Sequence, residues 1–244
     1  MALTFFSVTD PFAKPGNNTF VQGINATGQI VGGYVDNLNK EHGFLYTAGA
    51  YVTLDVPGAT FTDALGINSS GQIVGVFNDS NFKEHSFLFS NGSFTTIDNP
   101  NQSVSLTEAR GIDSRGNIVG IFFDQPGSHA FVRLANGGFF RTDPPGATSA
   151  DGLGINDTGQ IVGDFANNTG VHGFVQINGE FTPLDDPVTN ASNTIALGVN
   201  NAGQVAGHYQ LGSNQHGFLY SGGANGQFTT IDRPGGGSNG FLGI

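Results

Sequence analysis

One twelve-residue phrase, Gly-Ile-Asn-Ala-Thr-Gly-Gln-Ile-Val-Gly-Gly-Tyr, recurs in closely similar form five times and is the strongest constraint on the fold. The five copies begin at Gly23, Gly66, Gly111, Gly154 and Gly198, and a sixth, truncated start stands at Gly243. Successive starts are 43 to 45 residues apart. Because self-similarity at a fixed period of this length is typical of solenoids and propellers, the chain is expected to repeat one supersecondary unit.

Each unit has the pattern of four short strands. A first strand, such as residues 62–67, leads into a turn that starts with Asn or Asp and ends with Gly, which is the chemistry of a type I turn closed by a left-handed glycine. The second strand ends on an aromatic residue, the third begins with His and contains Phe, and the fourth is rich in β-branched residues. Four strands in about 44 residues predict an all-β, five-bladed β-propeller with four antiparallel strands in each blade.

This pattern also decides how the glycines are interpreted. A glycine-rich phrase suggests a phosphate-binding loop, but no Lys-Ser/Thr follows it and no helical periodicity continues it. The glycines are therefore expected to shape hairpins.

Composition agrees with a compact β protein and restricts its partners. The 244 residues include 39 Gly and 22 Phe, and only 11% are charged. A formal net charge of −11 with eight Lys and Arg leaves no basic stripe, which excludes nucleic acid and makes an anionic membrane surface an unsuitable partner. The absence of cysteine excludes disulfides and thiolate chemistry, and no run of about 18 apolar residues predicts a membrane span.

The two ends of the sequence share one layout of fourth strand, Pro/Gly loop and first strand. Residues 3–24 match residues 228–244 in this respect. We therefore expect a single propeller domain over residues 1–244, in which a strand pair from residues 1–22 closes the ring by completing the last blade, or in which the two ends compete. Because free strand edges pair with other strands, a monomer and a strand-exchanged dimer are both expected forms.

The phrase GINxxGQIVG, followed about twenty residues later by His-Ala/Gly-Phe-Leu, resembles the HAF repeat of bacterial extracellular proteins. The third unit contains the literal sequence His129-Ala130-Phe131. The resemblance covers essentially the whole chain and implies a β-propeller in an extracellular or periplasmic setting, without implying a reaction. The start, MALTFFSVTD, lacks the pattern of a signal peptide, so a cytoplasmic protein or prior removal of a leader is expected.

A histidine stands at the start of every third strand, at His42, His85, His129, His172 and His216. Because these strands belong to separate blades, the five side chains are not expected to converge on one metal ion. Each histidine is instead expected to bond to backbone or to a carboxylate in or beside its own blade. The candidate partners are the aspartates that end the fourth strands, namely Asp55, Asp98, Asp143, Asp185 and Asp232.

The position three residues before Gly-Ile differs among the units and holds Asp63, Glu108 and Asp151 in three successive ones. On the strand nearest the axis, these carboxylates are expected to form an acidic cluster at the axial mouth. Such a cluster is a candidate calcium site, because Ca²⁺ prefers oxygen ligands, or a candidate acid–base pair. The alternatives are solvated strand ends, or neutralisation by Arg110 beside Glu108.

A second variable position, on the second strand, holds Asp164 and His208 in the last two units. An Asp–His pair in neighbouring blades is a candidate general base with its orienting carboxylate, or an inter-blade hydrogen bond. No serine is placed as its nucleophile, so a catalytic triad is not supported.

These observations favour a non-catalytic module that binds a glycan or a protein through repeated inter-blade pockets or the axial mouth. The candidate ligand contacts are Asp63, Glu108, Arg110, Asp151, Asp164 and His208, with Tyr34, Tyr46, Tyr51 and Tyr220 as stacking faces for a sugar. One alternative is a hydrolase or lyase of glycosidase type, with the same residues except Arg110 as catalytic candidates. The other is a structural or interaction repeat. No cofactor other than calcium is expected.

Overall fold

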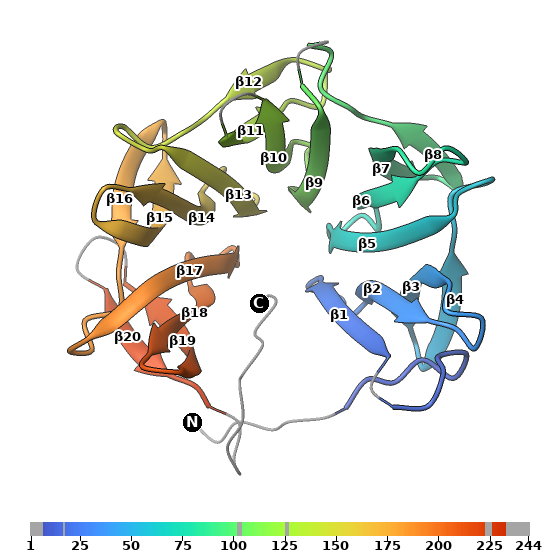
Figure 1. Ribbon diagram of the computed structural model, residues 1–244, viewed down its shortest axis with the longest axis horizontal. Coiled ribbons are helices and arrows are strands. Elements are labelled where there is room, and N and C mark those ends of the chain that lie inside the picture. The colour runs from blue at the N-terminus through green and yellow to red at the C-terminus, as the bar shows by residue number, and fades with distance from the viewer. Residues whose placement is uncertain (1–6, 17, 102–103, 125–126, 223–225, 233–244) are drawn as a thin grey trace.

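The computed structural model describes residues 7–16, 18–101, 104–124, 127–222 and 226–232. Over these residues the chain is all-β, and its strands form five sheets of four consecutive antiparallel strands. The sheets surround an axis like the blades of a propeller (Figure 1), which confirms the predicted five-bladed fold. The described part contains no helix that would cross a membrane.

In each blade the first strand lies nearest the axis and the fourth lies at the outer edge (Figure 1). The inner strands are β1 (Thr19–Ile24), β5 (Phe61–Ile67), β9 (Leu106–Ile112), β13 (Ser149–Ile155) and β17 (Ala191–Val199). The second strands are β2 (Ile30–Val35), β6 (Ile73–Asn78), β10 (Ile118–Asp124), β14 (Ile161–Asn167) and β18 (Val205–Leu211). The third strands are β3 (Glu41–Thr47), β7 (Glu84–Ser90), β11 (Gly127–Arg133), β15 (Gly170–Ile177) and β19 (Asn214–Ser221). The outer strands are β4 (Ala50–Leu54), β8 (Ser93–Thr96), β12 (Phe139–Arg141), β16 (Glu180–Leu184) and β20 (Gln227–Thr230).

The turn between the first and second strands confirms the hairpin interpretation of the glycine-rich phrase. In all five copies the turn glycine donates its N–H to the carbonyl oxygen three residues earlier at 3.0 Å, as Gly28 does to Asn25. The turn glycines have φ between 74° and 84°. This left-handed conformation costs a residue with a Cβ atom about 1–2 kcal/mol, so glycine is favoured there.

Each inner strand contains a β-bulge at the same repeat position, where one residue has no partner on the second strand, and β17 has a further register shift between Ser192 and Ile195. The residues at the shared bulge position are Gln22, Leu65, Arg110, Leu153 and Leu197. Beside the bulge, a carbonyl of the inner strand lies against the mid-strand glycine of the second strand. A Cβ atom on Gly120, for example, would lie 1.9 Å from the carbonyl oxygen of Glu108. The third glycine of the phrase is therefore a steric requirement of the bulged pairing.

The apolar core fills the spaces between blades. One phenylalanine from each third strand has no exposed surface, and these residues are Phe44, Phe87, Phe131, Phe174 and Phe218. Between the first two blades, Val31 packs with Ala64 and Phe87 in a single apolar cluster. Since truncating a buried phenylalanine to alanine costs about 3–5 kcal/mol, these side chains are major contributors to the cohesion of the blades.

The described residues include only part of the segments that were predicted to close the ring. β20 supplies the outer strand of the fifth blade, and β1 supplies the inner strand of the first. The strand predicted near the start of the sequence and the repeat of β1 near its end fall on residues 1–6 and 233–244, outside the described residues. Closure by the strand pair from residues 1–22, and the choice between monomer and strand-exchanged dimer, therefore stay predictions.

Candidate functional site

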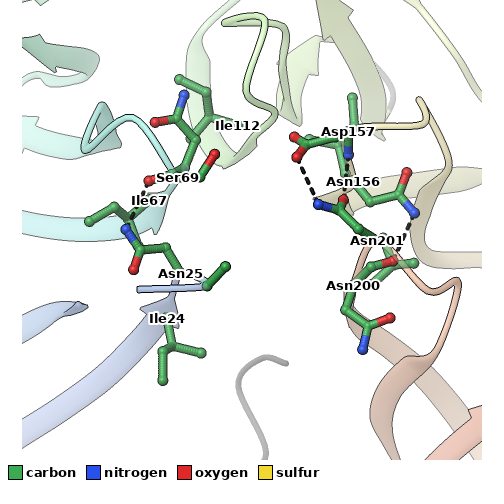
Figure 2. Close-up of a pocket in the computed structure, with 13 residues that line it drawn as sticks. Ile24, Asn25, Ile67, Ser69, Ile112, Asn156, Asp157, Asn200 and Asn201 are labelled. Carbon is green, nitrogen blue, oxygen red and sulfur yellow. Dashed lines mark hydrogen bonds between the residues drawn. The ribbon is translucent and has the colours of Figure 1, made fainter. Parts of the chain in front are cut away.

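A cup of about 480 Å³ opens at one end of the axis, where the five inner strands stop (Figure 2). Its walls are the last residues of these strands, which are all aliphatic: Ile24, Ile67, Ile112, Ile155 and Val199. The glycine before each of them lets the strands approach closely, since a Cβ atom on Gly154 would lie 3.0 Å from Cα of Gly198. Deeper along the axis, residues of the same five strands line a second, smaller space of about 80 Å³. We call this feature the axial cup.

The rim of the axial cup is made by the first residues of the turns. It consists of Asn25, Ala26, Asn68, Ser69, Asn156, Asp157, Asn200 and Asn201. The amide oxygen of each turn asparagine is held within its own turn, as Asn25 Oδ1 accepts from the backbone N–H groups of Thr27 and Gln29. Asp157 is the only acidic residue that lines the cup among the described residues. The cup therefore combines aliphatic walls with a largely neutral, hydrogen-bonding rim.

The rim asparagines also connect neighbouring blades, a role that was not predicted from the sequence. A side-chain amide donates to a backbone carbonyl of the next turn at 2.8–2.9 Å, in the pairs Asn25–Asn68, Asn68–Asp113 and Asn156–Asn200. Asp113 cannot donate in this way, and at its interface the N–H of Ser114 donates to Asp157 at 2.7 Å. The sequence did contain a signal for this role, because four of the five turns begin with Asn. Both Asn and Asp suit the turn, but only the Asn side chain can donate a hydrogen bond to the next blade.

The three acidic residues of the inner strands do not form the expected cluster at the axial mouth. None of them lines the axial cup. Asp63 lies between the first two blades, where Gln22 donates to its Oδ2 at 3.2 Å, and Asp151 lies between the third and fourth, where Ser128 bonds to it. Within the described ranges, no three His, Asp or Glu side chains gather closely enough to hold a metal ion. The calcium site expected from Asp63, Glu108 and Asp151 is therefore not formed.

Arg110 follows the alternative interpretation, neutralisation of its acidic neighbours. It forms an ion pair with Glu108, and its charge also acts to lower the pKa of Asp63 and of Asp164. Burial, and then a neighbouring carboxylate, act more strongly in the opposite direction and raise both pKa values to about 7. Near neutral pH these two carboxyl groups are therefore substantially protonated, unlike a cluster of solvated carboxylates.

Asp164 and His208 are not brought together. No hydrogen bond or ion pair joins them in the described part of the chain, and His208 Nδ1 has no hydrogen-bond partner there. Burial alone lowers the pKa of the His208 imidazole. The charges that act on the pKa of Asp164 are those of Asp151 in its own blade and of Arg110 in the third blade, and His208 is not among them. The described residues therefore do not form the predicted Asp164–His208 pair.

The five repeated histidines do form the predicted hydrogen bonds with aspartates of their own blades. Nδ1 lies 2.6–2.9 Å from a carboxylate oxygen in the pairs His42–Asp55, His85–Asp98, His129–Asp143, His172–Asp185 and His216–Asp232. Because a carboxylate only accepts, Nδ1 carries the proton. Each imidazole also packs on the aromatic ring that ends the second-strand motif, with centroids 5.1–5.5 Å apart.

His129→Ala is expected to lower the free energy of unfolding by about 2–3 kcal/mol, since it removes a buried imidazole and one of the donors to Asp143, which keeps the N–H of Ala130 and the side chain of Arg141. The His129 side chain is 5% exposed, bonds to Asp143, and approaches Asp124 at 3.0 Å without hydrogen-bond geometry. His172→Ala is the matched control, because its partner Asp185 is 49% exposed. A loss of about 1 kcal/mol is expected there. Equal losses in urea unfolding would contradict this account.

The tyrosines expected as sugar-stacking faces do not line the axial cup. Tyr34 and Tyr220 are buried in the core. Tyr46 and Tyr51 pack against each other with ring centroids 4.8 Å apart. A ligand in the cup would contact aliphatic side chains and no tyrosine of the described chain.

Comparison with known proteins finds solved structures with the same fold but does not identify a family for this chain. No protein-family model and no curated protein matches the sequence, so the HAF-type resemblance is not confirmed by them. Among solved structures, TolB from Acinetobacter baumannii aligns with a TM-score of 0.61 at 14% identity, covering 87% of this chain and 54% of TolB. A fucose-specific lectin from Aleuria aurantia aligns with a TM-score of 0.51 at 14% identity, covering 89% of this chain and 79% of the lectin.

A third structure shows that the shared fold does not select one activity. A post-proline cleaving enzyme from Rickettsia typhi aligns with a TM-score of 0.52 at 11% identity, covering 92% of this chain and 38% of the enzyme. At these identities the similarity establishes the β-propeller fold alone.

Proposed function

We propose that this chain is a non-catalytic binding module that holds a glycan in the axial cup. The observation that carries the proposal is the ring of aliphatic side chains beneath a rim that consists mainly of asparagine side chains, with the hydroxyl of Ser69. A sugar presents apolar C–H faces together with hydroxyl groups, and so complements both rings. The volume of about 480 Å³ lies within the range of small-molecule sites, roughly 300–1,000 Å³. The fold shared with a fucose-specific lectin supports a glycan as the ligand.

The residues of the axial cup argue against hydrolysis there. A typical glycosidase places two carboxyl groups on either side of the scissile bond. Asp157 is the one acid among the described residues that line the cup, and its two oxygens accept from the N–H of Ser114 and the amide of Asn201, each at 2.7 Å. The described lining of the cup therefore offers no second acid, and the carboxylate of Asp157 already takes part in contacts between turns.

An extracellular or periplasmic location is part of this proposal and is supported by the HAF-like motif. Cell fractionation of the native host, followed by detection with an antibody, tests it. Detection of the protein only in the cytoplasmic fraction would contradict it.

Binding is tested by screening the chain on a glycan array and titrating the best glycan calorimetrically. One site per chain is expected, because the axial cup lies on the symmetry axis. Ser69 is an exposed rim residue, so Ser69→Trp is expected to fill the cup and to lower affinity at least about tenfold, or about 1.4 kcal/mol. Ser70 is the next residue, equally exposed and outside the cup lining, so Ser70→Trp should leave affinity unchanged.

Two results would overturn the proposed site. A stoichiometry near five would place the ligand in the repeated inter-blade spaces. An equal loss of affinity in both tryptophan variants would show that the turn, and not the cup, determines binding.

A further inference from the structure

Between the first and second blades, two carboxylates from different blades lie against one glycine. Gly33 of β2 has no side chain at a position where the other blades carry Val76, Ile121, Asp164 and His208. A Cβ atom on Gly33 would lie 2.8 Å from Asp63 Oδ1 and 3.0 Å from Glu41 Oε1. Both carboxylate oxygens therefore face the small space that the missing side chain leaves.

Asp63 is buried there with an incomplete set of partners. Only 7% of its surface is exposed, and Oδ1 has no hydrogen-bond partner among the described residues. Gln22 donates to the other oxygen, Oδ2, at 3.2 Å. Glu41 is partly buried and adds a second negative charge that acts on Asp63. A buried carboxylate in this arrangement is costly unless a positive charge or a proton pairs with it.

The interface between the second and third blades carries the same pair of acids together with a cation. Glu84 and Glu108 occupy the repeat positions of Glu41 and Asp63, and their charges also repel. Arg110 forms an ion pair with Glu108 and attracts Glu84. The positive charge of Arg110 also acts to lower the pKa of Asp63, but the guanidinium forms its ion pair with Glu108 and not with Asp63. The Glu41–Asp63 pair has no equivalent ion pair in the described residues.

We propose that a calcium ion binds between Glu41 and Asp63 and takes the role that Arg110 has at the next interface. Calcium accepts carboxylate oxygens at about 2.3–2.6 Å and tolerates irregular ligand sets that include water, which suits one buried and one partly exposed carboxylate. Magnesium requires a near-ideal octahedron and releases its water reluctantly. The ion would link β3 of the first blade to β5 of the second. This site is separate from the axial cup and independent of the proposed glycan.

The test uses the full chain, freed of metal by a chelator and titrated with CaCl₂ at pH 8. Calorimetry is expected to show one calcium ion per chain, and a saturating concentration is expected to raise Tm by about 5 °C. Glu41→Gln removes one ligand charge at a partly exposed position and is expected to abolish the Tm shift. Glu84→Gln is the matched control, since its interface already contains Arg110, and it should keep the full shift.

Three results would overturn the calcium site. One is the absence of calcium binding by the wild-type chain, which calorimetry reports whether or not a variant folds. Another is an equal Tm shift with KCl at the same ionic strength, which would indicate general screening of the acidic chain. The third is an undiminished shift in Glu41→Gln.

Discussion

Gly120→Ala is expected to lower the free energy of unfolding by at least about 4 kcal/mol, enough to prevent a stable fold in a protein of ordinary stability. The reason is steric, because the added Cβ atom would lie 1.9 Å from the carbonyl oxygen of Glu108 and 2.8 Å from the ring of Phe131. Neither neighbour can move freely: the carbonyl belongs to the bulged strand β9, and Phe131 is fully buried. Soluble yield, far-ultraviolet circular dichroism and urea unfolding measure the effect.

Gly116→Ala is the control in the same blade. Gly116 has φ of 84°, but a Cβ atom there would meet nothing closer than 3.6 Å. A loss of only about 1–2 kcal/mol is expected, from backbone strain without a clash. If the Gly116 variant were as destabilised as the Gly120 variant, the clash at the bulge would not be the reason for the third glycine of the phrase.

Asp164→Asn is expected to stabilise the protein at pH 8 by up to about 4 kcal/mol and to leave its stability at pH 4 nearly unchanged. Burial, followed by the charge of Asp151, raises the pKa of Asp164 from 3.8 to about 7. The folded state therefore holds this proton more tightly than the unfolded state. The wild type consequently loses stability as pH rises from about 4 to 7, whereas the amide variant keeps a neutral group throughout. Urea unfolding at a series of pH values measures the difference.

Asp157→Asn provides a control in which the expected change in stability has the opposite sign. Burial acts to raise the pKa of Asp157, but hydrogen bonds from Ser114 and Asn201 outweigh it and lower the pKa. The charged form of Asp157 thus favours folding above its unfolded pKa, and this contribution is lost as pH falls through the folded pKa. Replacement by asparagine should therefore reduce stability near neutral pH. A pH profile for Asp164→Asn parallel to that of the wild type would contradict the buried-carboxyl account.

The fold was predictable because every unit repeats the same local chemistry. The turn glycines, the buried third-strand phenylalanines and the His–Asp pairs each recur five times at fixed spacing, so each copy supports the interpretation of the others. His42 and Asp55, for example, are partners in the structure as the spacing predicted. Agreement among independent local signals is what specifies one backbone arrangement.

The candidate site was harder to predict, because it depends on a shift in strand register. In a regular strand, side chains two residues apart point to the same side, so Asp63 would be expected to point toward the axis as Leu65 does. The bulge at Leu65 changes this: Leu65 and Arg110, at the same bulge position, line the narrow part of the axis, while Asp63 packs between blades. A bulge has no reliable signature in one sequence, and so the acidic residues were assigned to the wrong surface. The inter-blade role of the turn asparagines was missed because turn formation alone already explained them.

The central claim is that the axial cup is the binding site, and nuclear magnetic resonance tests it most directly. Isotope-labelled protein is titrated with the glycan that binds best on the array, and the backbone amide signals are followed. The account predicts that shift changes concentrate in the five turns that begin at Asn25, Asn68, Asp113, Asn156 and Asn200, with one binding event per chain. Shift changes confined to the outer strands β4, β8, β12, β16 and β20, with the turns unaffected, would contradict it.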